Sequence, residues 1–214
     1  MGVALADASE ILPETAMLRY RNGSPALFSN RFRYELQRRG KGIWLDSDVY
    51  LIRPLPHLLP LFGRQDNVLL NSAVLWLQQD CEMLEPLLAL FDERHVPSWL
   101  PFAARMSAHV RRFVSGRVGL ERLPWGATGP LALSALAERF GVLADALPPQ
   151  LLYPVPWSEA EWIFDPHQRL EHKVTPETLA VHLWNELIRR RKDEEPASGS
   201  FFERLHREAR GEEP

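Results

Sequence analysis

The chain has 214 residues, of which 45% are hydrophobic and 25% are charged. These values are ordinary for a globular protein and exclude collagen-like, disulfide-scaffold and wholly disordered chains. The formal net charge of -3 offers no positive field for a nucleic-acid backbone, so we expect no nucleic-acid partner. Cys81 is the single cysteine and cannot form a disulfide within the chain, which favours a reducing compartment.

The ends of the chain and its apolar runs predict where the protein acts. No uninterrupted apolar run reaches about 18 residues, so we expect no transmembrane segment. The N-terminus reaches Asp7 without a basic residue, unlike a secretory signal, and we therefore expect a cytoplasmic protein. A polar breaker after residue 192 divides the chain into one main domain, residues 1–192, and a polar linker with a C-terminal amphipathic helix, residues 193–214.

Apolar periodicity and turn signals predict alternating helices and strands in the main domain. The first helix takes Ser24 as its N-cap and Pro25 as its first residue, buries Phe28, Phe32 and Leu36, and ends before Gly40. The patterns that follow predict helices over residues 82–94, 102–113, 130–140 and 185–192, and strands over residues 43–45, 49–52, 68–77, 151–153 and 179–184. This alternation is typical of an α/β layer structure, in which ligands gather at the carboxyl ends of the strands.

Two basic clusters lie in the second half of the chain. The run over residues 189–192 is interpreted as cations at a helix C-terminus, paired with the acids that follow, and the alternative is a peripheral membrane contact that gathers lipid-linked acceptors. A looser cluster is interpreted as a solvated helix face: His109, Arg111, Arg112 and Arg117.

Asp46 and Asp48 follow the strand predicted over residues 43–45 and form a D-x-D pair. On an extended chain, side chains at i and i+2 point to the same side, so both carboxylates can face one hard cation and its phosphate ligands. The alternative is a surface turn whose acids are merely solvated. Their place at the end of a hydrophobic strand favours a metal-diphosphate site.

Three segments together resemble a known family. The segment from Phe28 to Leu55, FSNRFRYELQRRGKGIWLDSDVYLIRPL, resembles the core of the DXD-containing glycosyltransferases of the sugar-binding-region type, a family 32-like group that includes capsular polysaccharide synthesis proteins. The loop 125–130, WGATGP, is similar to the TGP loop of that family, and residues 182–184, HLW, are similar to its C-terminal HxW.

The resemblance implies a GT-A-like, Rossmann-like fold, a nucleoside diphosphate sugar donor, Mn²⁺ or Mg²⁺, and transfer with retention. It implies that Asp48 binds the metal and that Asp46 reaches the ribose and the donor sugar, so both are candidate catalytic residues. It places His182 near the metal, as a ligand or an orienting group, and lets the Trp184 indole donate to the diphosphate from the same strand face. The alternatives are a satisfied strand histidine and ordinary core packing for the tryptophan.

The resemblance also assigns four positions to donor or acceptor binding. Asn30 and Arg33 match the D-x-x-R of the family, with an amide in place of the acid, and the alternative is an exposed polar helix face. Asn71 matches a strand on the acceptor side, where a strand-end turn is the alternative. Gly129 would let the backbone approach the sugar, and the alternative is a glycine that only serves the start of the following helix. The resemblance implies that the chain begins at the second strand of the family, so we expect an N-terminally shortened fold, through either a late start codon or a natural shortening.

We therefore expect a retaining, metal-dependent glycosyltransferase that moves a sugar to a saccharide or lipid-linked saccharide acceptor, in surface polysaccharide synthesis. The first alternative is a degenerate relative that binds nucleotide-sugar without turnover, suggested by Asn30 and the missing first strand. Another D-x-D enzyme, such as a nucleotidyltransferase, would need a Gly-rich phosphate loop that the sequence lacks. A structural or scaffold protein is a further alternative, and in such a protein Asp48 could be replaced without loss of function.

Overall fold

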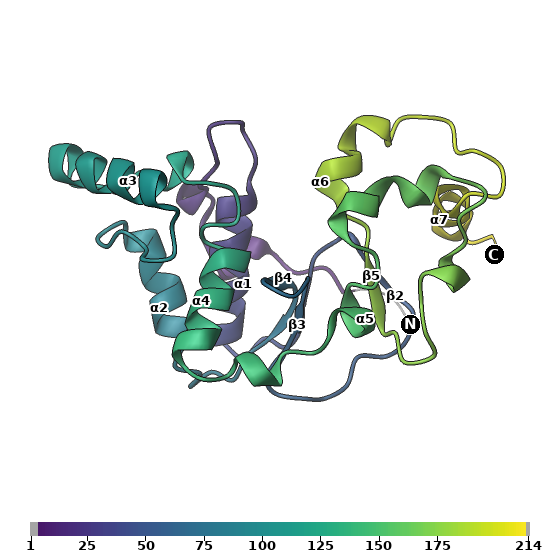
Figure 1. Cartoon of the computed structure of the whole chain (residues 1–214), viewed down its shortest axis with the longest axis horizontal. Coiled ribbons are helices and arrows are strands. Elements are labelled where there is room, and N and C mark those ends of the chain that lie inside the picture. The colour runs from purple at the N-terminus through teal and green to yellow at the C-terminus, as the bar shows by residue number, and fades with distance from the viewer. Residues whose placement is uncertain (1–3, 213–214) are drawn as a thin grey trace.

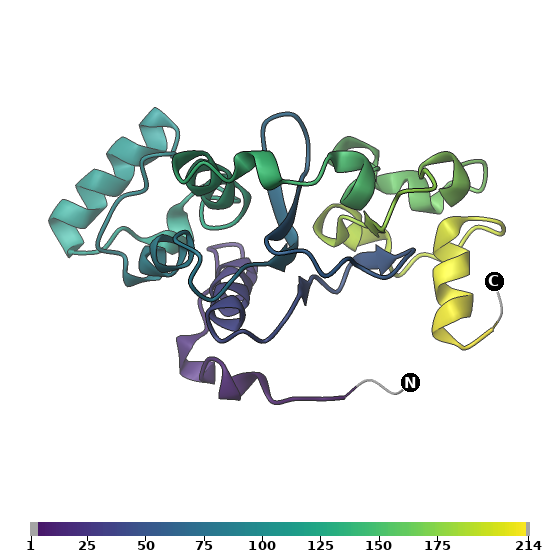
Figure 2. The same ribbon diagram turned by 90° about the horizontal axis from the view of Figure 1, so that it is seen from below.

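A computed structural model describes residues 4–212 and shows two halves side by side along the long axis (Figure 1). The helical half comprises α1 (Ala26–Arg38), α2 (Leu84–Ala89), α3 (Phe102–Ser115), α4 (Pro130–Arg139) and strands β1 (Trp44–Leu45), β3 (Leu61–Arg64) and β4 (Leu70–Trp76). The ribbon half comprises β2 (Val49–Leu51), β5 (Ala180–His182), α6 (Asn185–Ile188), α7 (Phe201–Ala209) and the 3-10 helix η6 (Trp157–Phe164). Seen from below, α3 and α7 lie at opposite ends of the molecule (Figure 2).

The remaining elements are short. They are α5 (Pro149–Leu152) and the 3-10 helices η1 (Ala8–Glu10), η2 (Glu14–Ala16), η3 (Leu90–Asp92), η4 (Leu120–Arg122), η5 (Leu143–Asp145), η7 (Leu170–His172) and η8 (Arg189–Arg191). Across residues 4–212, no helix combines the length and the apolar character that crossing a bilayer requires.

The strands form two small antiparallel sheets. β4 lies between β1 and β3, and the register pairs Leu45 with Val74. β2 pairs with β5 in a separate two-stranded ribbon, in which Val49 lies opposite His182. The mixed helix and sheet content agrees with the predicted α/β class, but the paired strands run antiparallel. The acids therefore do not lie at a carboxyl edge of parallel strands, and the joint between the two sheets positions them instead.

Each half has its own apolar core, and a third cluster joins them. The helical half buries residues of α1, α2, α4 and β4, and the ribbon half buries residues of η6, β5 and α7. The joining cluster contains Val74 of β4, Leu152 of α5 and Ala180 of β5. Tyr153 belongs to it as well, and its phenol oxygen accepts the Val74 N–H at 3.0 Å. The joint is therefore a buried contact, which fixes the two halves as one body around the site.

Helix α1 buries its polar face. Its N-cap is Pro25, one residue after the predicted Ser24, whose hydroxyl accepts the Ala26 N–H at 3.4 Å. The predicted apolar stripe, Phe28, Phe32 and Leu36, is only half-buried, whereas Leu27 and Tyr34 are buried together with Asn30, Arg33 and Gln37. The interpretation of Asn30 and Arg33 as an exposed polar face is therefore wrong. Partners on distant strands and loops hold these polar groups in the interior.

Several other predicted elements differ from the structure. Residues 151 and 152 end helix α5 and Tyr153 is its C-cap, so no strand forms here, because Pro148 and Pro149 preset the φ angles of a first helical turn. The helix predicted over 82–94 is split into α2 and η3, and the helix over 185–192 into α6 and η8. The last strand ends at His182, two residues early, and β3 was not predicted. Helices α3, α4 and α7 lie where the patterns indicate.

The terminal segments make specific contacts with the ribbon half. Arg191 forms an ion pair with Glu194 at 2.9 Å, which confirms the expected pairing of the basic run with the acids after it. In α7, the ring of Phe201 stacks on Trp162 of η6 with centroids 4.9 Å apart. Burial of this ring fastens α7 to the ribbon half.

Helix α3 belongs to a long excursion whose two ends are joined by one buried acid. Glu93 adopts a left-handed conformation with φ 57°. Its carboxylate accepts the backbone N–H groups of Gly119 at 2.7 Å and Leu120 at 3.3 Å, and it pairs with the Arg117 guanidinium. Four donors on one buried carboxylate make a strong anchor because such hydrogen bonds are charge-assisted. The excursion is therefore closed at its base.

Candidate metal and nucleotide-sugar site

The segment Asp46-Ser47-Asp48 connects the two sheets. Asp46 N–H donates to the Ala73 carbonyl of β4 at 2.8 Å, and the Asp48 carbonyl accepts the Leu183 N–H at 2.8 Å. Between them the chain makes a turn, in which Val49 N–H donates to the Asp46 carbonyl at 3.1 Å. The two carboxylates therefore converge through a turn and not through the predicted extended alternation. Each acid is anchored to a different half of the molecule.

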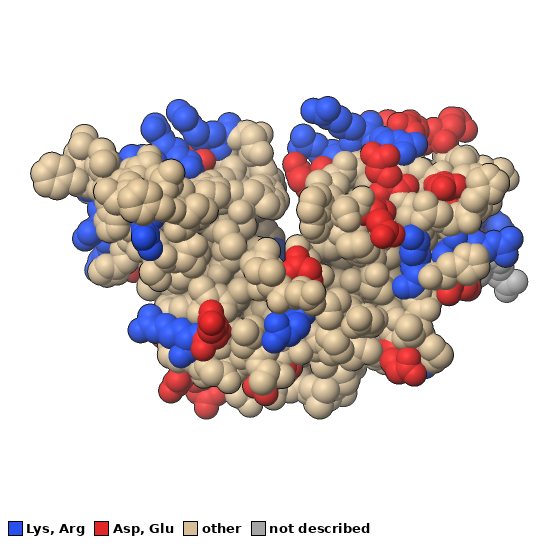
Figure 3. Space-filling view, in the orientation of Figure 1, with Lys and Arg blue, Asp and Glu red and all other residues tan. Residues whose placement is uncertain are grey.

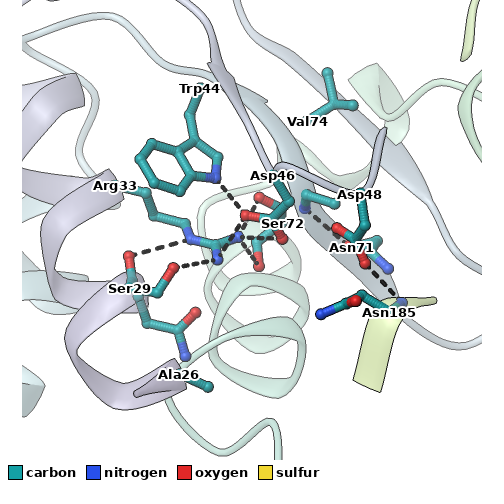
Figure 4. A network of polar contacts seen from close by, with 12 residues as sticks. Ala26, Ser29, Arg33, Trp44, Asp46, Asp48, Asn71, Ser72, Val74 and Asn185 are labelled. Carbon is teal, nitrogen blue, oxygen red and sulfur yellow. Dashed lines mark hydrogen bonds and ion pairs between the residues drawn. The ribbon is translucent and has the colours of Figure 1, made fainter. Parts of the chain in front are cut away.

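Asp46 is held by the helical half (Figure 4). Its carboxylate accepts the Trp44 indole N–H at 2.7 Å and pairs with the Arg33 guanidinium at 3.0 Å. Arg33 is buried and also donates to the Ser72 carbonyl, to the Ser72 hydroxyl at 2.9 Å and to the Ser29 hydroxyl at 3.1 Å. Burial raises the pKa of Asp46 and outweighs the opposing effects of Arg33 and Trp44.

Asp48 is held by the ribbon half. Its Oδ2 lies 3.2 Å from the Nε2 of His182 and accepts the Asn185 backbone N–H at 2.8 Å. Burial alone would raise the pKa of Asp48, but the hydrogen bond and charge of His182, with the Asn185 N–H, lower it below its ordinary value. The two acids of one motif thus have pKa values shifted in opposite directions.

The structure brings Asp46, Asp48 and His182 together as one cluster. Each offers a ligand atom, and these atoms all lie within 4.8 Å of one another. The side chains of Asp46 and Asp48 are 24% and 20% exposed, so a ligand can reach both from solvent. Two carboxylates with one imidazole suit Mn²⁺, and the carboxylates suit Mg²⁺ as well.

Two buried polar atoms beside the cluster support the fit of a metal or phosphate ligand. Among the described residues, His182 Nδ1 and Asn185 Oδ1 have no hydrogen-bond partner. Buried polar groups are normally paired, so unpaired atoms beside a set of oxygen and nitrogen donors are expected where a ligand completes the network. Figure 4 shows Asn185 with Asp48 and Asp46 at the same joint.

Trp184 does not occupy the predicted position. Strand β5 ends at His182, and Trp184 adopts φ 54°, so the two residues do not share a strand face. The indole N–H donates to the Val155 carbonyl at 2.9 Å, and the ring packs against His182 with centroids 4.2 Å apart. In this structure the indole N–H is therefore engaged within the protein, and its donation to a diphosphate stays a prediction. Trp184 buttresses the imidazole instead.

Asn30 and Gly129 lie against each other, although 99 residues of sequence separate them. The Asn30 amide donates to the Thr128 hydroxyl at 3.0 Å. A Cβ built on Gly129 would lie 3.0 Å from the Asn30 side chain, so a larger residue at 129 would require Asn30 to shift. The space beside Gly129 that a sugar was expected to use is occupied by Asn30.

Asn71 is buried in β4 with both ends of its amide engaged. Its nitrogen donates to Gln65 at 3.0 Å, and its oxygen accepts the Ala73 N–H at 2.8 Å. The interpretation as a strand-end turn is wrong because Asn71 lies within β4.

Sequence reasoning missed several residues that support the site: Ser29, Trp44, Ser72 and Asn185. Trp44 lies two residues before Asp46 and Asn185 directly follows the HLW segment, so the motifs themselves gave a signal for these two.

A surface hollow elsewhere contains no predicted site residue, and it is lined by Ser158, Glu159, Glu161, Trp162, Phe164, Asp165, Gln168 and Arg191. Figure 3 shows a notch between the two halves.

Comparisons with known proteins bear on this site. Residues 124–209 match the conserved region of alpha 1,4-glycosyltransferases, a segment that contains His182 but neither Asp46 nor Asp48. Lactosylceramide 4-alpha-galactosyltransferase of Pongo pygmaeus is 25% identical over 171 residues, which cover 74% of this chain and 67% of the relative. The enzymes of Homo sapiens and Mus musculus are 27% and 26% identical over 171 residues, 74% of this chain and 41% of each relative.

The chain thus spans less than half the length of the human and mouse relatives. No solved structure matches it. Both kinds of match are to glycosyltransferases.

Proposed function

We propose that this protein is a metal-dependent, retaining glycosyltransferase that moves a sugar from a nucleoside diphosphate sugar to a saccharide or lipid-linked saccharide. The relatives are named as 4-alpha-galactosyltransferases acting on lactosylceramide, so a galactosyl donor and a glycolipid acceptor are the first candidates. Synthesis of a surface polysaccharide or glycolipid is the corresponding role.

The observation that carries this proposal is the cluster of Asp46, Asp48 and His182. Transfer from such a donor releases a diphosphate, whose negative charge grows in the transition state. Asp48 and His182 would hold a divalent cation, which when bound stabilises that charge. The Arg33 guanidinium and the Asn185 N–H fix the two carboxylates before any ligand arrives, so little reorganisation is needed.

The opposite environments of the acids support separate roles. The pKa of Asp48 is lowered, so it stays ionised over the whole physiological range and is the stronger cation ligand. Asp46 is already neutralised by Arg33 and bonded to Trp44, and this arrangement suits an acceptor for a ribose or sugar hydroxyl. Asp48 and His182 are therefore proposed as metal ligands and Asp46 as the link to the donor.

Release of nucleoside diphosphate tests the proposal because slow donor hydrolysis needs no known acceptor. We would screen UDP- and GDP-sugars with Mn²⁺ or Mg²⁺ and compare the wild type with Asp48→Asn. The matched control is Asp80→Asn, which changes an exposed acid away from the cluster. We expect metal-dependent release from one donor, lost in Asp48→Asn and kept in Asp80→Asn. Equal release by both variants would refute the assignment.

A binding-only relative is the second candidate, and specific observations favour it. The Asn30 amide and the Trp184 indole, both expected to contact the donor, are engaged by Thr128 and Val155. Calorimetry with the same donors distinguishes the two functions. Metal-dependent binding without release, with or without lactosylceramide, would replace the enzyme by a nucleotide-sugar-binding protein. With an active donor, the anomeric configuration of the product, measured by NMR, tests retention.

A further inference from the structure

Helix α3 presents an apolar face to solvent. Of its 14 residues, all of them described, Ala108 alone is buried. Phe113 is 92% exposed, Val114 77%, Phe102 71%, Val110 59% and Met106 47%. Single exposed apolar side chains are ordinary, but five on one helix form a patch that calls for a partner.

The exposed residues form one continuous stripe. At about 100° per residue, Phe102, Met106, Val110 and Phe113 lie within an arc of about 80°, and Val114 extends it to about 120°. Ala104 and Ala108 lie on the opposite side and pack on the core of the helical half. The helix is therefore amphipathic with its larger apolar face turned outward, the reverse of a helix that serves a core.

The charge of this region is of one sign. Residues 94–120 contain five arginines and no aspartate or glutamate, in a chain whose formal net charge is -3. By the same angles, Arg105, His109 and Arg112 lie in an arc of about 60° directly beside the apolar stripe. Figure 3 shows uncharged surface at the α3 end with Lys and Arg atoms around its margin.

The stripe is held in place by the fold and is not a frayed segment. Gly116 ends the helix with φ 75°, and its N–H donates to the Arg112 carbonyl at 2.9 Å. Arg111 reaches back to the Val118 carbonyl at 2.8 Å, and the Glu93 carboxylate joins the base of the excursion. An apolar face fixed outward gains free energy when a surface covers it and removes it from water.

We infer that α3 binds the surface of an anionic lipid bilayer, lying in the interface with its apolar stripe among the acyl chains and its arginines at the headgroups. An apolar face with Phe beside a basic polar face is the pattern of interfacial helices. Antiparallel pairing with a second copy, through a two-fold axis across the helix, fits less well because it would bring the Arg105 and Arg112 margins of both copies to the same side. Lipid phosphates, in contrast, complement those margins.

Vesicle flotation of the full chain tests the inference. The probes are vesicles of phosphatidylcholine mixed with phosphatidylglycerol, and vesicles of phosphatidylcholine alone. We expect the wild type to float with the anionic vesicles and to be released as salt is raised. No binding to anionic vesicles, or equal binding to both kinds at all salt concentrations, would overturn the inference. Flotation needs no nucleotide sugar, so its result does not depend on the proposed transfer.

Variants locate the binding surface. Phe102→Ser with Phe113→Ser should weaken partitioning into anionic vesicles at least about tenfold, because two aromatic side chains no longer enter the acyl region. The matched control, Leu58→Ser with Val68→Ser, removes two exposed apolar side chains elsewhere and should bind as the wild type does. Arg112→Gln should cost about fivefold, the worth of one basic residue at such a surface.

Sedimentation equilibrium and thermal unfolding complete the test. A monomeric wild type, and variants that unfold at the wild-type temperature, support lipid as the partner. A wild-type dimer that Phe102→Ser with Phe113→Ser converts to monomer would assign the stripe to a second copy and overturn the inference. Full vesicle binding by that double variant would do the same.

Discussion

The two halves of the molecule hold the two acids of one D-x-D motif in different ways. In the helical half, Asp46 faces a guanidinium that is itself buried and tied to Ser72 and Ser29. In the ribbon half, Asp48 faces an imidazole and a backbone N–H, and its pKa is lowered where that of Asp46 is raised. Two acids separated by one residue therefore differ because the joint between the halves passes between them.

This difference indicates a mainly structural role for Asp46 and a ligand-binding role for Asp48. Arg33 is buried and Asp46 is only partly exposed, so removing the carboxylate would leave the buried guanidinium without its counter-charge. Asp48 borders two unpaired atoms and has capacity left for an incoming cation. Changes on the helical side should therefore cost stability first, and changes on the ribbon side should cost ligand binding first.

The largest effect is expected for Arg33→Met. It removes the counter-charge of Asp46 and a donor to the Ser72 carbonyl, and we expect the free energy of unfolding to fall by about 3 kcal/mol. Urea unfolding measures it. The control is Arg31→Met, a half-buried arginine on the same helix, which should cost less than about 1 kcal/mol. Equal losses of unfolding free energy in both variants would show that the Arg33–Asp46 ion pair does not stabilise the fold.

The next effect is on metal affinity. Asp48→Asn should weaken Mn²⁺ binding by about tenfold to a hundredfold, and Asp46→Asn should weaken it less, since Arg33 already neutralises that carboxylate. Electron paramagnetic resonance of free Mn²⁺ measures both. A larger loss in Asp46→Asn would reverse the assignment of the two acids.

A smaller effect is expected for Trp184→Phe. The change removes the indole N–H that donates a hydrogen bond to the Val155 carbonyl, and it should lower the free energy of unfolding by about 1 to 2 kcal/mol. The affinity for the nucleotide sugar should stay unchanged because the indole N–H points into the protein. Trp157→Phe, at an exposed tryptophan, is the control for stability. A weaker donor affinity at unchanged stability would instead support indole contact with the diphosphate.

The smallest effect concerns pH. Because the pKa of Asp48 is lowered in the folded state, its ionised form stabilises the protein above 3.8, the ordinary value, and this contribution is lost as the pH falls through the folded pKa. The gap in unfolding free energy between wild type and Asp48→Asn should therefore be constant near neutral pH and narrow below 3.8. A gap that widens on acidification would contradict the lowered pKa.

Local signals were enough to predict much of the fold. Pro130 at a helix start, the periodicity of α3 and α4, and the apolar strand before Asp46 all act within a few residues of sequence. The same signals failed at Tyr153, where two prolines outweigh an apolar run, and at Trp184, where the chain leaves the strand.

The candidate site was predictable as a set of residues but not as a set of contacts. Asp46, Asp48 and His182 were chosen from motifs, and the structure brings them together. The burial of Asn30 was hidden because it depends on Thr128, 98 residues away. The Arg33 bond to Ser72 likewise crosses 39 residues. Pairings at that range leave no periodic trace in a single sequence.

The Glu93 clamp has a consequence for how this protein can change over time. One carboxylate joins the residues before and after the α3 excursion, so the base is held by contacts that do not pass through the exposed turns of the helix. Insertions and deletions in a closed excursion cost little closure entropy. The turns of α3 beyond the buried Ala108 can thus change and suit another surface while the acids at the joint stay in place.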